Sequence, residues 1–366
     1  MAPGRGLALA GALMAGSGQV TSAAHGYRLY DLAEVARRDP AAQAYFAQTP
    51  LDPQGWRRLP PDSPFRAGME QFLAEFGHRA VNEIEISTPR WNDDPTYLLE
   101  QVRFLLAAGP GRQPRQAARA ARAAAEAELK RRTFLLRPLV RFLAARARQA
   151  AALREAGKSA IMALWEVMRA VPLEIGRRLT AAGALDKPED VFDLAVVDGE
   201  SFLRGEWDGR GARALVADRK ARRAAWLAES PPAVLVLDAE GRPAALPAAP
   251  AAVPVAPGAH GAELRGLGVS AGRASGPARV LRHPDEGARL QNGDVLVAPS
   301  TDPGWTPLFL RASALVLEVG GYLSHGAIVA REYGLPAVAN LPGVLSAVRD
   351  GQLLTVDGDA GRVELG

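Results

Sequence analysis

Two hydrophobic periodicities divide this chain. Between residues 27 and 228, apolar positions recur every three or four residues, which is the spacing that buries one face of an α-helix. After residue 262, short valine- and leucine-rich runs alternate with glycine turns, a pattern typical of buried strands. The patterns predict a multidomain fold: a mostly α-helical N-terminal region at residues 1–228, a linker at 229–261 and a C-terminal α/β domain at 262–366.

Several predicted helices have recognisable ends. They cover Tyr27–Arg38, Pro40–Ala47, Phe65–Glu75, Thr96–Ala108, Gln116–Ala156 and Lys158–Ala182, and the helical region ends near Ala228. Pro138 predicts a kink or break and Pro172 a break, because proline lacks the backbone donor that a helix interior needs. The many arginines of Gln116–Ala156 predict a solvated helix face. The apolar stripe that begins at Ile161 predicts either core packing or the wall of a binding pocket.

The linker at residues 229–261 contains seven prolines and many alanines. This composition predicts an extended, semi-rigid tether, which suits a domain that must travel. The predicted strands of the C-terminal domain are Leu264–Val269, Ala278–Leu281, Val295–Ala298, Ala314–Leu317, Pro336–Ala339, Leu353–Val356 and Val363–Leu365.

Composition excludes several classes of protein. The 366 residues include no cysteine, which excludes disulfides, thiolate zinc sites and cysteine nucleophiles. The net charge is +4, but no compact basic patch with interleaved aromatic residues occurs, so no nucleic-acid partner is expected. The apolar run from Leu7 to Ala15 is too short to cross a membrane, and a cytoplasmic location without a membrane partner is expected. Thr21–Ala24 leaves a cleaved signal peptide as a second interpretation of the first residues.

The stretch Glu318–Val338 carries the strongest chemical signal. It follows a short apolar run and predicts a glycine turn, an N-cap at Ser324, a helix, and a C-cap at Gly334. His325 is therefore expected at a helix N-terminus, where backbone N–H groups and the helix dipole attract an anion and disfavour a charged imidazole. A neutral histidine beside an anion site fits a phosphoryl-accepting nucleophile. The local pattern alone also fits a helix cap or a surface histidine.

This stretch resembles the phosphohistidine swivelling, or mobile, domain of the PEP-utilizing enzyme family, most closely in its rifampin phosphotransferase branch and next in its phosphoenolpyruvate synthase branch. The matching positions are Gly320, Gly321, Ser324, His325, Gly326, Ala330-Arg331-Glu332 and Gly334–Val338. The resemblance implies a β/β/α swivelling fold for residues 262–366 and a phosphoryl carrier at His325. It also implies that side chains and turns around the histidine support it, namely Gly320, Gly321, Ser324, Gly326 and Arg331.

Two further segments resemble the same family. Thr301–Phe309 is similar to its Thr-Asp-Pro-x-Trp-Thr-Pro loop, and Trp305 is expected in the core. Asn340 stands where the family usually has glycine, and asparagine tolerates the left-handed conformation. Residues 76–91 resemble part of the family's helical acceptor-binding domain, with matches at Arg79, Glu83, Glu85, Arg90 and Trp91.

The charged residues among these matches could bind phosphate or transfer a proton. Arg79 and Arg90 could grip a phosphate, and Glu83 and Glu85 could orient them or take a hydroxyl proton. A structural ion-pair network is the alternative for all four. His78 has no counterpart in the family pattern and is expected to be structural.

In that family, a phosphoryl group passes from ATP to the histidine in an ATP-grasp domain, and the swivelling domain carries it to a second site. No ATP-grasp pattern occurs in this sequence, and Gly18–Phe46 resembles the interior of a longer enzyme. The resemblance implies that this chain alone holds no cofactor and no metal. ATP and Mg²⁺ would act through a partner ATP-grasp domain or subunit.

The sequence therefore predicts a phosphotransferase component that relays a phosphoryl group through phospho-His325 to a hydroxylated small molecule. Two alternatives stay open: a phosphoenolpyruvate-synthase-like fragment, and a non-catalytic remnant that binds a ligand or partner.

Overall fold

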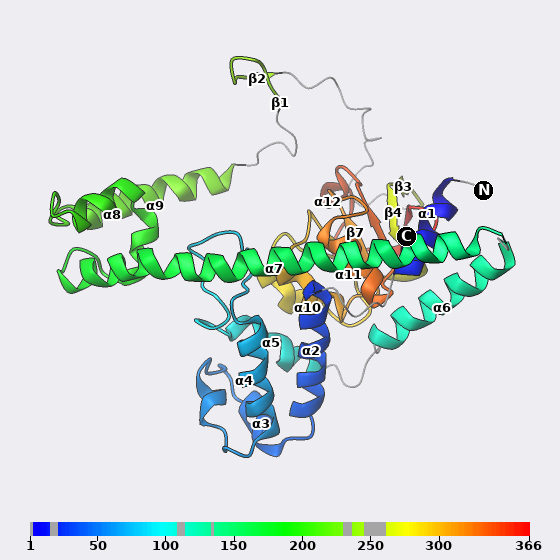
Figure 1. Ribbon diagram of the computed structural model, residues 1–366, viewed down its shortest axis with the longest axis horizontal. Coiled ribbons are helices and arrows are strands. Elements are labelled where there is room, and N and C mark those ends of the chain that lie inside the picture. Colours follow the sequence, from blue (N-terminus) through cyan, green and yellow to red (C-terminus); the bar gives the residue numbers. More distant parts are fainter. Residues whose placement is uncertain (1–2, 15–20, 108–113, 133–134, 230–235, 245–260) are drawn as a thin grey trace. The chain divides into compact units, whose positions relative to one another are not determined.

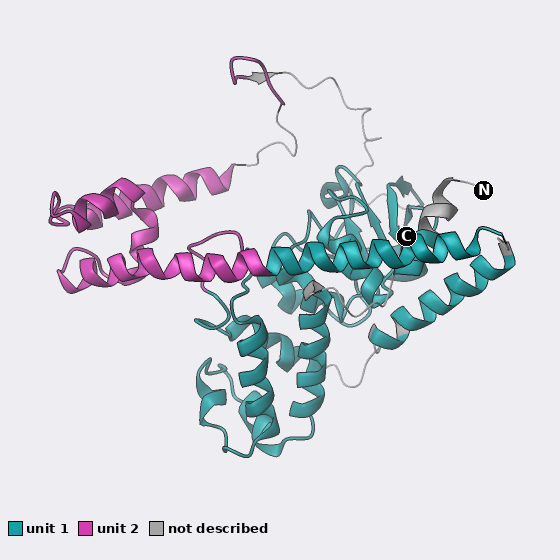
Figure 2. Cartoon of the chain, in the orientation of Figure 1, with its two compact units in different colours: residues 1–82, 90–159, 250–366 teal, residues 83–89, 160–249 magenta. Residues whose placement is uncertain are grey.

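The structure is a computed structural model that describes residues 3–14, 21–107, 114–132, 135–229, 236–244 and 261–366. The chain forms two compact units (Figure 2): unit 1 contains residues 1–82, 90–159 and 250–366, and unit 2 contains residues 83–89 and 160–249. Unit 1 thus combines helices of the N-terminal region with the whole C-terminal sheet, a division that differs from the one at residues 228 and 262. The predicted linker at 229–261 lies mostly outside the described residues.

The helices of unit 1 are α1 (Pro3–Met14), α2 (Thr21–Ala36), α3 (Pro40–Phe46), α4 (Pro64–Phe76), α5 (Thr96–Ala107), α6 (Pro114–Arg132) and the first part of α7 (Arg137–Ala181) (Figure 1). Helices α2 to α5 lie where the apolar periodicity predicts helices, with ends shifted by a few residues. Helix α1 was not predicted, the predicted helix Gln116–Ala156 is divided between α6 and α7, and α7 continues through the predicted boundary before Lys158. Local capping fixes several starts: the Asp39 carboxylate accepts from the backbone N–H groups of Ala41 and Ala42 at 3.0 and 3.2 Å. Aromatic and leucine side chains of α2 to α5 form one hydrophobic core, which includes Trp56, Phe65 and Trp91.

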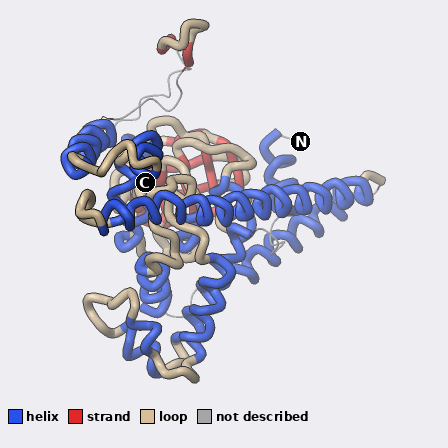
Figure 3. Tube along the Cα trace, turned by 60° about the vertical axis from the view of Figure 1, so that its left-hand side comes forward, coloured by secondary structure: helices blue, strands red, loops and turns tan. Residues whose placement is uncertain are grey.

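Unit 2 contains the rest of α7, followed by η2 (Pro188–Asp193), α8 (Val196–Leu203), α9 (Ala212–Ala228) and a small hairpin of β1 (Val236–Leu237) and β2 (Pro243–Ala244). Its small core gathers Leu179, Leu185, Val191, Ala212 and Val216. Helix is the predominant structure of the described chain (Figure 3).

One prediction on α7 was wrong and another holds in part. Pro138 stands at the start of α7, where a missing N–H costs nothing, but Pro172 lies inside the helix instead of breaking it. In the apolar stripe, the side chains of Ile161, Leu164, Met168 and Val171 are exposed. Ile175 packs against the core of unit 2, so core packing is confirmed at that end of the stripe, and a pocket wall stays a prediction for the exposed part.

The C-terminal domain is built on a mixed sheet of eight strands in the order β3-β10-β9-β5-β6-β7-β8-β4. Its strands are β3 (Glu263–Arg265), β4 (Leu267–Ser270), β5 (Arg273–Val280), β6 (Val295–Ala298), β7 (Ala314–Leu317), β8 (Ala337–Ala339), β9 (Leu353–Asp357) and β10 (Arg362–Leu365). Strands β5 to β8 are parallel to one another, and the other pairs are antiparallel. Strands β6 and β7 are buried along their whole length, as their unbroken apolar runs predict.

The predicted strand Leu264–Val269 is split at Gly266. Its two halves, β3 and β4, stand at opposite ends of the strand order, so one residue joins the two edges and the sheet must curl round. Gly266 permits this because a Cβ there would lie 2.5 Å from the carbonyl oxygen of Ala339. Within the described part of the chain, no helix has the length and apolar character needed to cross a membrane.

Candidate functional site

The site is centred on α11 (His325–Tyr333), which is joined to the end of the buried strand β7 by the seven residues 318–324. Ser324 occupies the N-cap position, as expected, but its hydroxyl donates to the carbonyl of Gly321 at 2.8 Å instead of capping the helix. Gly334 ends the helix in the left-handed conformation, with φ of 60°. His325 is therefore the first residue of the helix, where backbone N–H groups lack partners within the helix.

The glycines around His325 have distinct roles. A Cβ on Gly326 would lie 2.5 Å from the Thr301 hydroxyl and 2.8 Å from a Leu317 methyl, so only glycine lets the helix start approach β7 this closely. A Cβ on Gly320 would meet the Ser324 hydroxyl at 3.3 Å, whereas one on Gly321 would meet nothing within 4 Å. The turn thus leaves open space beside the histidine at Gly321.

The imidazole of His325 contacts the loop that resembles the family's Thr-Asp-Pro-x-Trp-Thr-Pro motif. Its Nε2 lies 3.1 Å from the hydroxyl of Thr306, which is fully buried at the start of α10 (Thr306–Phe309). The Asp302 carboxylate shapes this loop by accepting from the N–H groups of Gly304 at 2.9 Å and Asn82 at 3.1 Å. The predicted core position of Trp305 is confirmed.

The electrostatic environment keeps His325 neutral. Removal of water by the packed atoms around the ring lowers its pKa well below the usual value of 6.5, and the positive charge of Lys158 lowers it further. His25, Arg79 and Arg154 act in the same direction. A neutral imidazole with a lone pair is the nucleophilic form, and the positive charges of Lys158, Arg79 and Arg154 would attract the charge of a phosphoryl group.

Two of these cations come from one face of α7. Arg154 and Lys158 are four residues apart, so their side chains lie on the same side of the helix. The guanidinium of Arg154 is held by the buried carboxylate of Glu155, with Nη1 2.6 Å from Oε1. The sequence pattern assigned Arg154, among the arginines of Gln116–Ala156, to a solvated face, and it gave Lys158 no role near His325. One signal was available: Lys158 is one of only four lysines in a chain rich in arginine.

The remaining neighbour, His25, is supplied by α2 and was also missed. It is fully buried, and its ring packs edge-on against Trp91 and Phe76, with centroids 5.5 and 6.1 Å away. Gly26, the next residue, packs against Thr306, which in turn contacts His325. Nothing in the local sequence of α2 connects it to a histidine 300 residues further on.

Arg331 is placed to support the turn that precedes the histidine. Its guanidinium donates to the carbonyls of Val269 at 3.0 Å and of Tyr322, and the side chain is buried. Burial lowers the pKa of Arg331 to about 10, opposed by Glu332 and Tyr322, so it is charged at neutral pH. It bridges β4 to the glycine turn and stabilises the backbone that presents His325.

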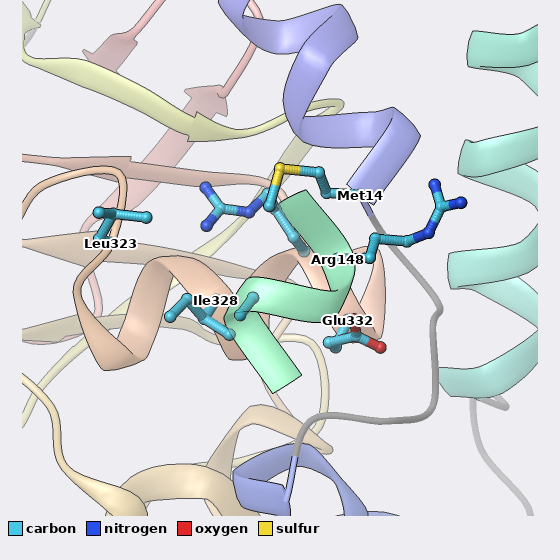
Figure 4. A pocket seen from close by; sticks show the side chains of 7 residues that line it. Met14, Arg148, Leu323, Ile328 and Glu332 are labelled. Atoms are coloured by element: carbon cyan, nitrogen blue, oxygen red, sulfur yellow. The ribbon is translucent and has the colours of Figure 1, made fainter. Parts of the chain in front are cut away.

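The face of α11 that carries Ile328 and Glu332 borders a small cavity of about 20 Å³, the space of a single water molecule. Met14 of α1 and Arg148 of α7 line it together with these side chains and Leu323 (Figure 4). Arg148 also donates to the carbonyl of Leu13 at 2.8 Å, which ties α7 to α1. The close fit of α1 and α7 on α11 holds the histidine helix against the N-terminal helices.

The candidate acceptor residues fall into both units. Arg79 and Arg90 are buried in unit 1, where the backbone N–H of Trp91 donates to the carbonyl of Arg79 at 2.9 Å, and Arg79 is the one whose charge reaches His325. Glu83 and Glu85 belong to unit 2. Glu85 accepts from the N–H and hydroxyl of Ser87 at 3.0 and 2.8 Å, which stabilises a local turn.

Two further observations concern chemistry near the site. His78 lies with Nε2 3.1 Å from the hydroxyl of Ser159, consistent with the structural role expected for it. Among the described residues, no three histidine, aspartate or glutamate side chains are grouped so that they could hold a metal ion.

Acid is expected to loosen the packing of α11. Because the pKa of His325 is depressed in the folded chain, below pH 6.5 the unfolded chain binds a proton on this histidine that the folded chain does not bind. This contribution to stability is complete above pH 6.5 and falls about tenfold in equilibrium constant per pH unit below it. Thermal unfolding measured at pH 5.5 and 7.5 tests this, with His325→Asn as the control. An identical pH response in His325→Asn would contradict the assignment.

Two protein-family models match parts of the chain. The model of the rifampicin phosphotransferase fourth domain matches residues 2–155, and the model of the PEP-utilising enzyme mobile domain matches residues 290–361. The second match includes His325 and Thr306, and the first includes Arg79, Arg154 and His25.

Curated relatives cover nearly the whole chain. It is 35% identical over 95% of its length to a rifampicin phosphotransferase from Streptomyces sviceus, of which it spans 40%. It is 29% identical over 93% of its length to a rifampicin phosphotransferase from Bacillus subtilis, of which it spans 39%. It is 33% identical over 92% of its length to the prodigiosin synthesizing transferase PigC of Serratia marcescens, of which it spans 38%.

The chain therefore spans about 40% of the length of the curated relatives it matches. Both parts of it have a counterpart in them, and the resemblance noted in the sequence is confirmed. The chain carries a mobile domain of the PEP-utilising enzyme family, with His325 within it, together with a domain of the rifampicin phosphotransferase type.

Proposed function

We propose that this chain is a phosphotransferase component in which His325 accepts a phosphoryl group from an ATP-binding donor domain and passes it to a hydroxylated small molecule. One observation carries the proposal. The imidazole at the start of α11 is buried beside the Thr306 hydroxyl, burial and the charges of Lys158 and Arg79 lower its pKa, and it lies inside the segment that matches the mobile domain of the PEP-utilising family.

Two displacement steps account for the relay. In the first, a lone pair of the imidazole attacks phosphorus of the donor, an N–P bond forms and the P–O bond of the nucleotide breaks. In the second, the acceptor hydroxyl attacks phosphorus, the N–P bond breaks and the hydroxyl proton passes to a base. Positive charges near the transferring group stabilise the equatorial oxygens in both steps.

The chain's own residues divide this work. Thr306 holds the ring by its contact with Nε2, and Lys158 and Arg79 provide positive charge. A carboxylate would take the acceptor proton, and Glu155, which forms an ion pair with Arg154, is the candidate in unit 1. Glu83 and Glu85 stay candidates for the same role in unit 2.

The names of the relatives indicate only the chemical class of the acceptor. Relatives of similar identity are named for rifampicin phosphorylation and for prodigiosin synthesis, two different small molecules. We therefore propose a hydroxylated small molecule as acceptor and an ATP-grasp domain or subunit as the partner that binds ATP and Mg²⁺.

Reconstitution tests the relay. The chain is mixed with labelled ATP, Mg²⁺ and the part of the Streptomyces sviceus relative that it does not cover. We expect acid-labile, base-stable label on His325, as a phosphoramidate bond requires, and no label when the donor part is omitted. Isothermal titration of the chain alone with ATP and Mg²⁺ should show no specific binding.

Each other result has a meaning. Label on the chain alone, or micromolar binding of ATP to it, would show that the chain contains a nucleotide site of its own. A folded chain that no donor part can label would favour the non-catalytic interpretation.

A further inference from the structure

One turn of α2 is packed into the core of the C-terminal sheet domain. Ala23 and Tyr27 belong to the same buried cluster as Trp305, Leu308 and Phe309, although about 280 residues separate them in the sequence. This turn therefore contributes to the core that holds α10 and α11, the helices that carry Thr306 and His325.

Two tyrosines join α2 to the end of α11 reciprocally. The hydroxyl of Tyr27 donates to the carbonyl of Glu332, and the hydroxyl of Tyr333 donates to the carbonyl of Ala23 at 2.9 Å. Their rings are 4.9 Å apart at an angle of 53°. Burial raises the pKa of both hydroxyls above the usual value of 10, so both are protonated donors at neutral pH.

Gly26 lies between these tyrosines and leaves no space for a side chain. A Cβ at this position would be 1.9 Å from the Tyr333 hydroxyl oxygen and 3.0 Å from the Thr306 Cγ2. Real Cβ atoms do not approach other atoms at the first of these distances, so either the buried Tyr333 ring would be displaced or α11 would shift on α2. The position of α11 on α2 thus depends on glycine at residue 26.

A cation–π contact with Arg115 of α6 also holds the ring of Tyr27. The guanidinium of Arg115 lies over its ring, 4.9 Å from the centroid, and forms two bonds to the Asp31 carboxylate at 2.7 and 2.8 Å. Tyr27 is thereby held in one orientation by α2 and α6, and it can act as a rigid contact for α11.

We propose that Ala23, Gly26, Tyr27, Glu332 and Tyr333 form a docking seat that places His325 against Thr306 and the cations of the N-terminal helices. Gly26, Tyr27 and Tyr333 are then positioning residues: they touch neither substrate nor nucleotide and act through the placement of α11. The proposal rests on the proposed function in one respect: the docking explains the placement of His325 as a phosphoryl carrier. The docking contacts themselves require no phosphoryl group.

The docking seat predicts that one substitution changes the pKa of His325 and that a second substitution partly restores it. NMR titration of the full chain follows the five histidines separately, assigned by substitution. We expect Gly26→Ala to raise the His325 pKa from its depressed value towards the ordinary value of about 6.5, because the ring leaves its dry, cationic surroundings. In Gly26→Ala/Tyr333→Phe, the hydroxyl that clashes is gone, but its bond to the Ala23 carbonyl is lost and the ring carbon Cζ stays 3.1 Å from the new Cβ, so the pKa should return part of the way to the wild-type value.

Gly157→Ala is the matched control. Gly157 also lies inside a helix, α7, but a Cβ there meets nothing within 4 Å, so the His325 pKa should stay at the wild-type value. Circular dichroism checks that each variant is folded. If Gly26→Ala does not fold, Tyr27→Phe replaces it: loss of the bond to the Glu332 carbonyl should raise the pKa of His325 by a smaller amount.

The outcomes separate the seat from the proposed function. An unchanged His325 pKa in folded Gly26→Ala, or a double variant no closer to wild type than the single one, would overturn the seat. If Gly26→Ala and Tyr27→Phe behave as expected but no donor part labels His325, the seat stands and the relay fails. If labelling proceeds normally in Gly26→Ala while the pKa has shifted, the seat serves the second transfer and not the first.

Discussion

Replacing His325 with asparagine is expected to abolish labelling of the chain from ATP in the reconstituted reaction. Asparagine keeps a polar side chain at the first position of α11 but has no lone pair of comparable nucleophilicity, so no N–P bond can form. The loss should be complete, because removal of a covalent carrier leaves no route through the same intermediate. Label retained on the variant would assign the carrier to another residue.

A matched substitution controls for folding. His283 likewise lies at the start of a helical turn, as the N-cap of η3 (Pro284–Arg289), and its Nδ1 accepts from the N–H of Asp285 at 3.4 Å. Asparagine is a good N-cap, so His283→Asn should fold and be labelled like the wild type. Equal loss of label in both variants would indicate a general defect and not a specific role for His325.

Much of the fold was predictable because local rules and tertiary packing agree in the C-terminal domain. Val295–Ala298 and Ala314–Leu317 are strands with the predicted bounds, since unbroken apolar runs of this length suit the centre of a sheet covered on both faces. Asn340 adopts the left-handed conformation, with φ of 59°, in place of glycine. Gly334 likewise ends its helix as predicted.

Predictions failed where distant contacts override local preference. Pro172 does not break α7, because the helix continues through it by losing a single backbone bond. Leu264–Val269 is divided because Gly266 must pass close to the carbonyl of Ala339 in a neighbouring strand. A local sequence pattern does not indicate how close these two segments lie in the folded chain.

The surroundings of His325 were unpredictable for the same reason. The motif identified the histidine from its own neighbours, but His25, Lys158 and Thr306 reach it from three other parts of the chain. An arginine-rich helix is most often a solvated face, and most arginines of α6 and α7 fit that rule. Arg154 differs because this part of α7 lies near His325, and this proximity is a property of the three-dimensional structure.

Replacing Lys158 with methionine is expected to slow phosphorylation of His325 by about 10²- to 10³-fold. Lys158 is the charged neighbour with the largest effect on the ring, and loss of a preorganised charge near the transferring group has this typical magnitude. The same change should raise the His325 pKa, because a positive neighbour disfavours the imidazolium ion. Rates of labelling and NMR titration measure the two effects on one variant.

Three comparisons make the Lys158 prediction specific. Lys158→Arg keeps the charge and should leave the His325 pKa depressed while restoring only part of the rate, since the geometry of a guanidinium differs. Arg154→Met should have a smaller effect on both, because the Arg154 side chain is 51% exposed and water screens its charge. Lys130→Met, on the exposed side of α6, should change neither. A rate loss in Lys158→Met without any rise of the His325 pKa would show that Lys158 acts on the donor and not on the electrostatics of the histidine.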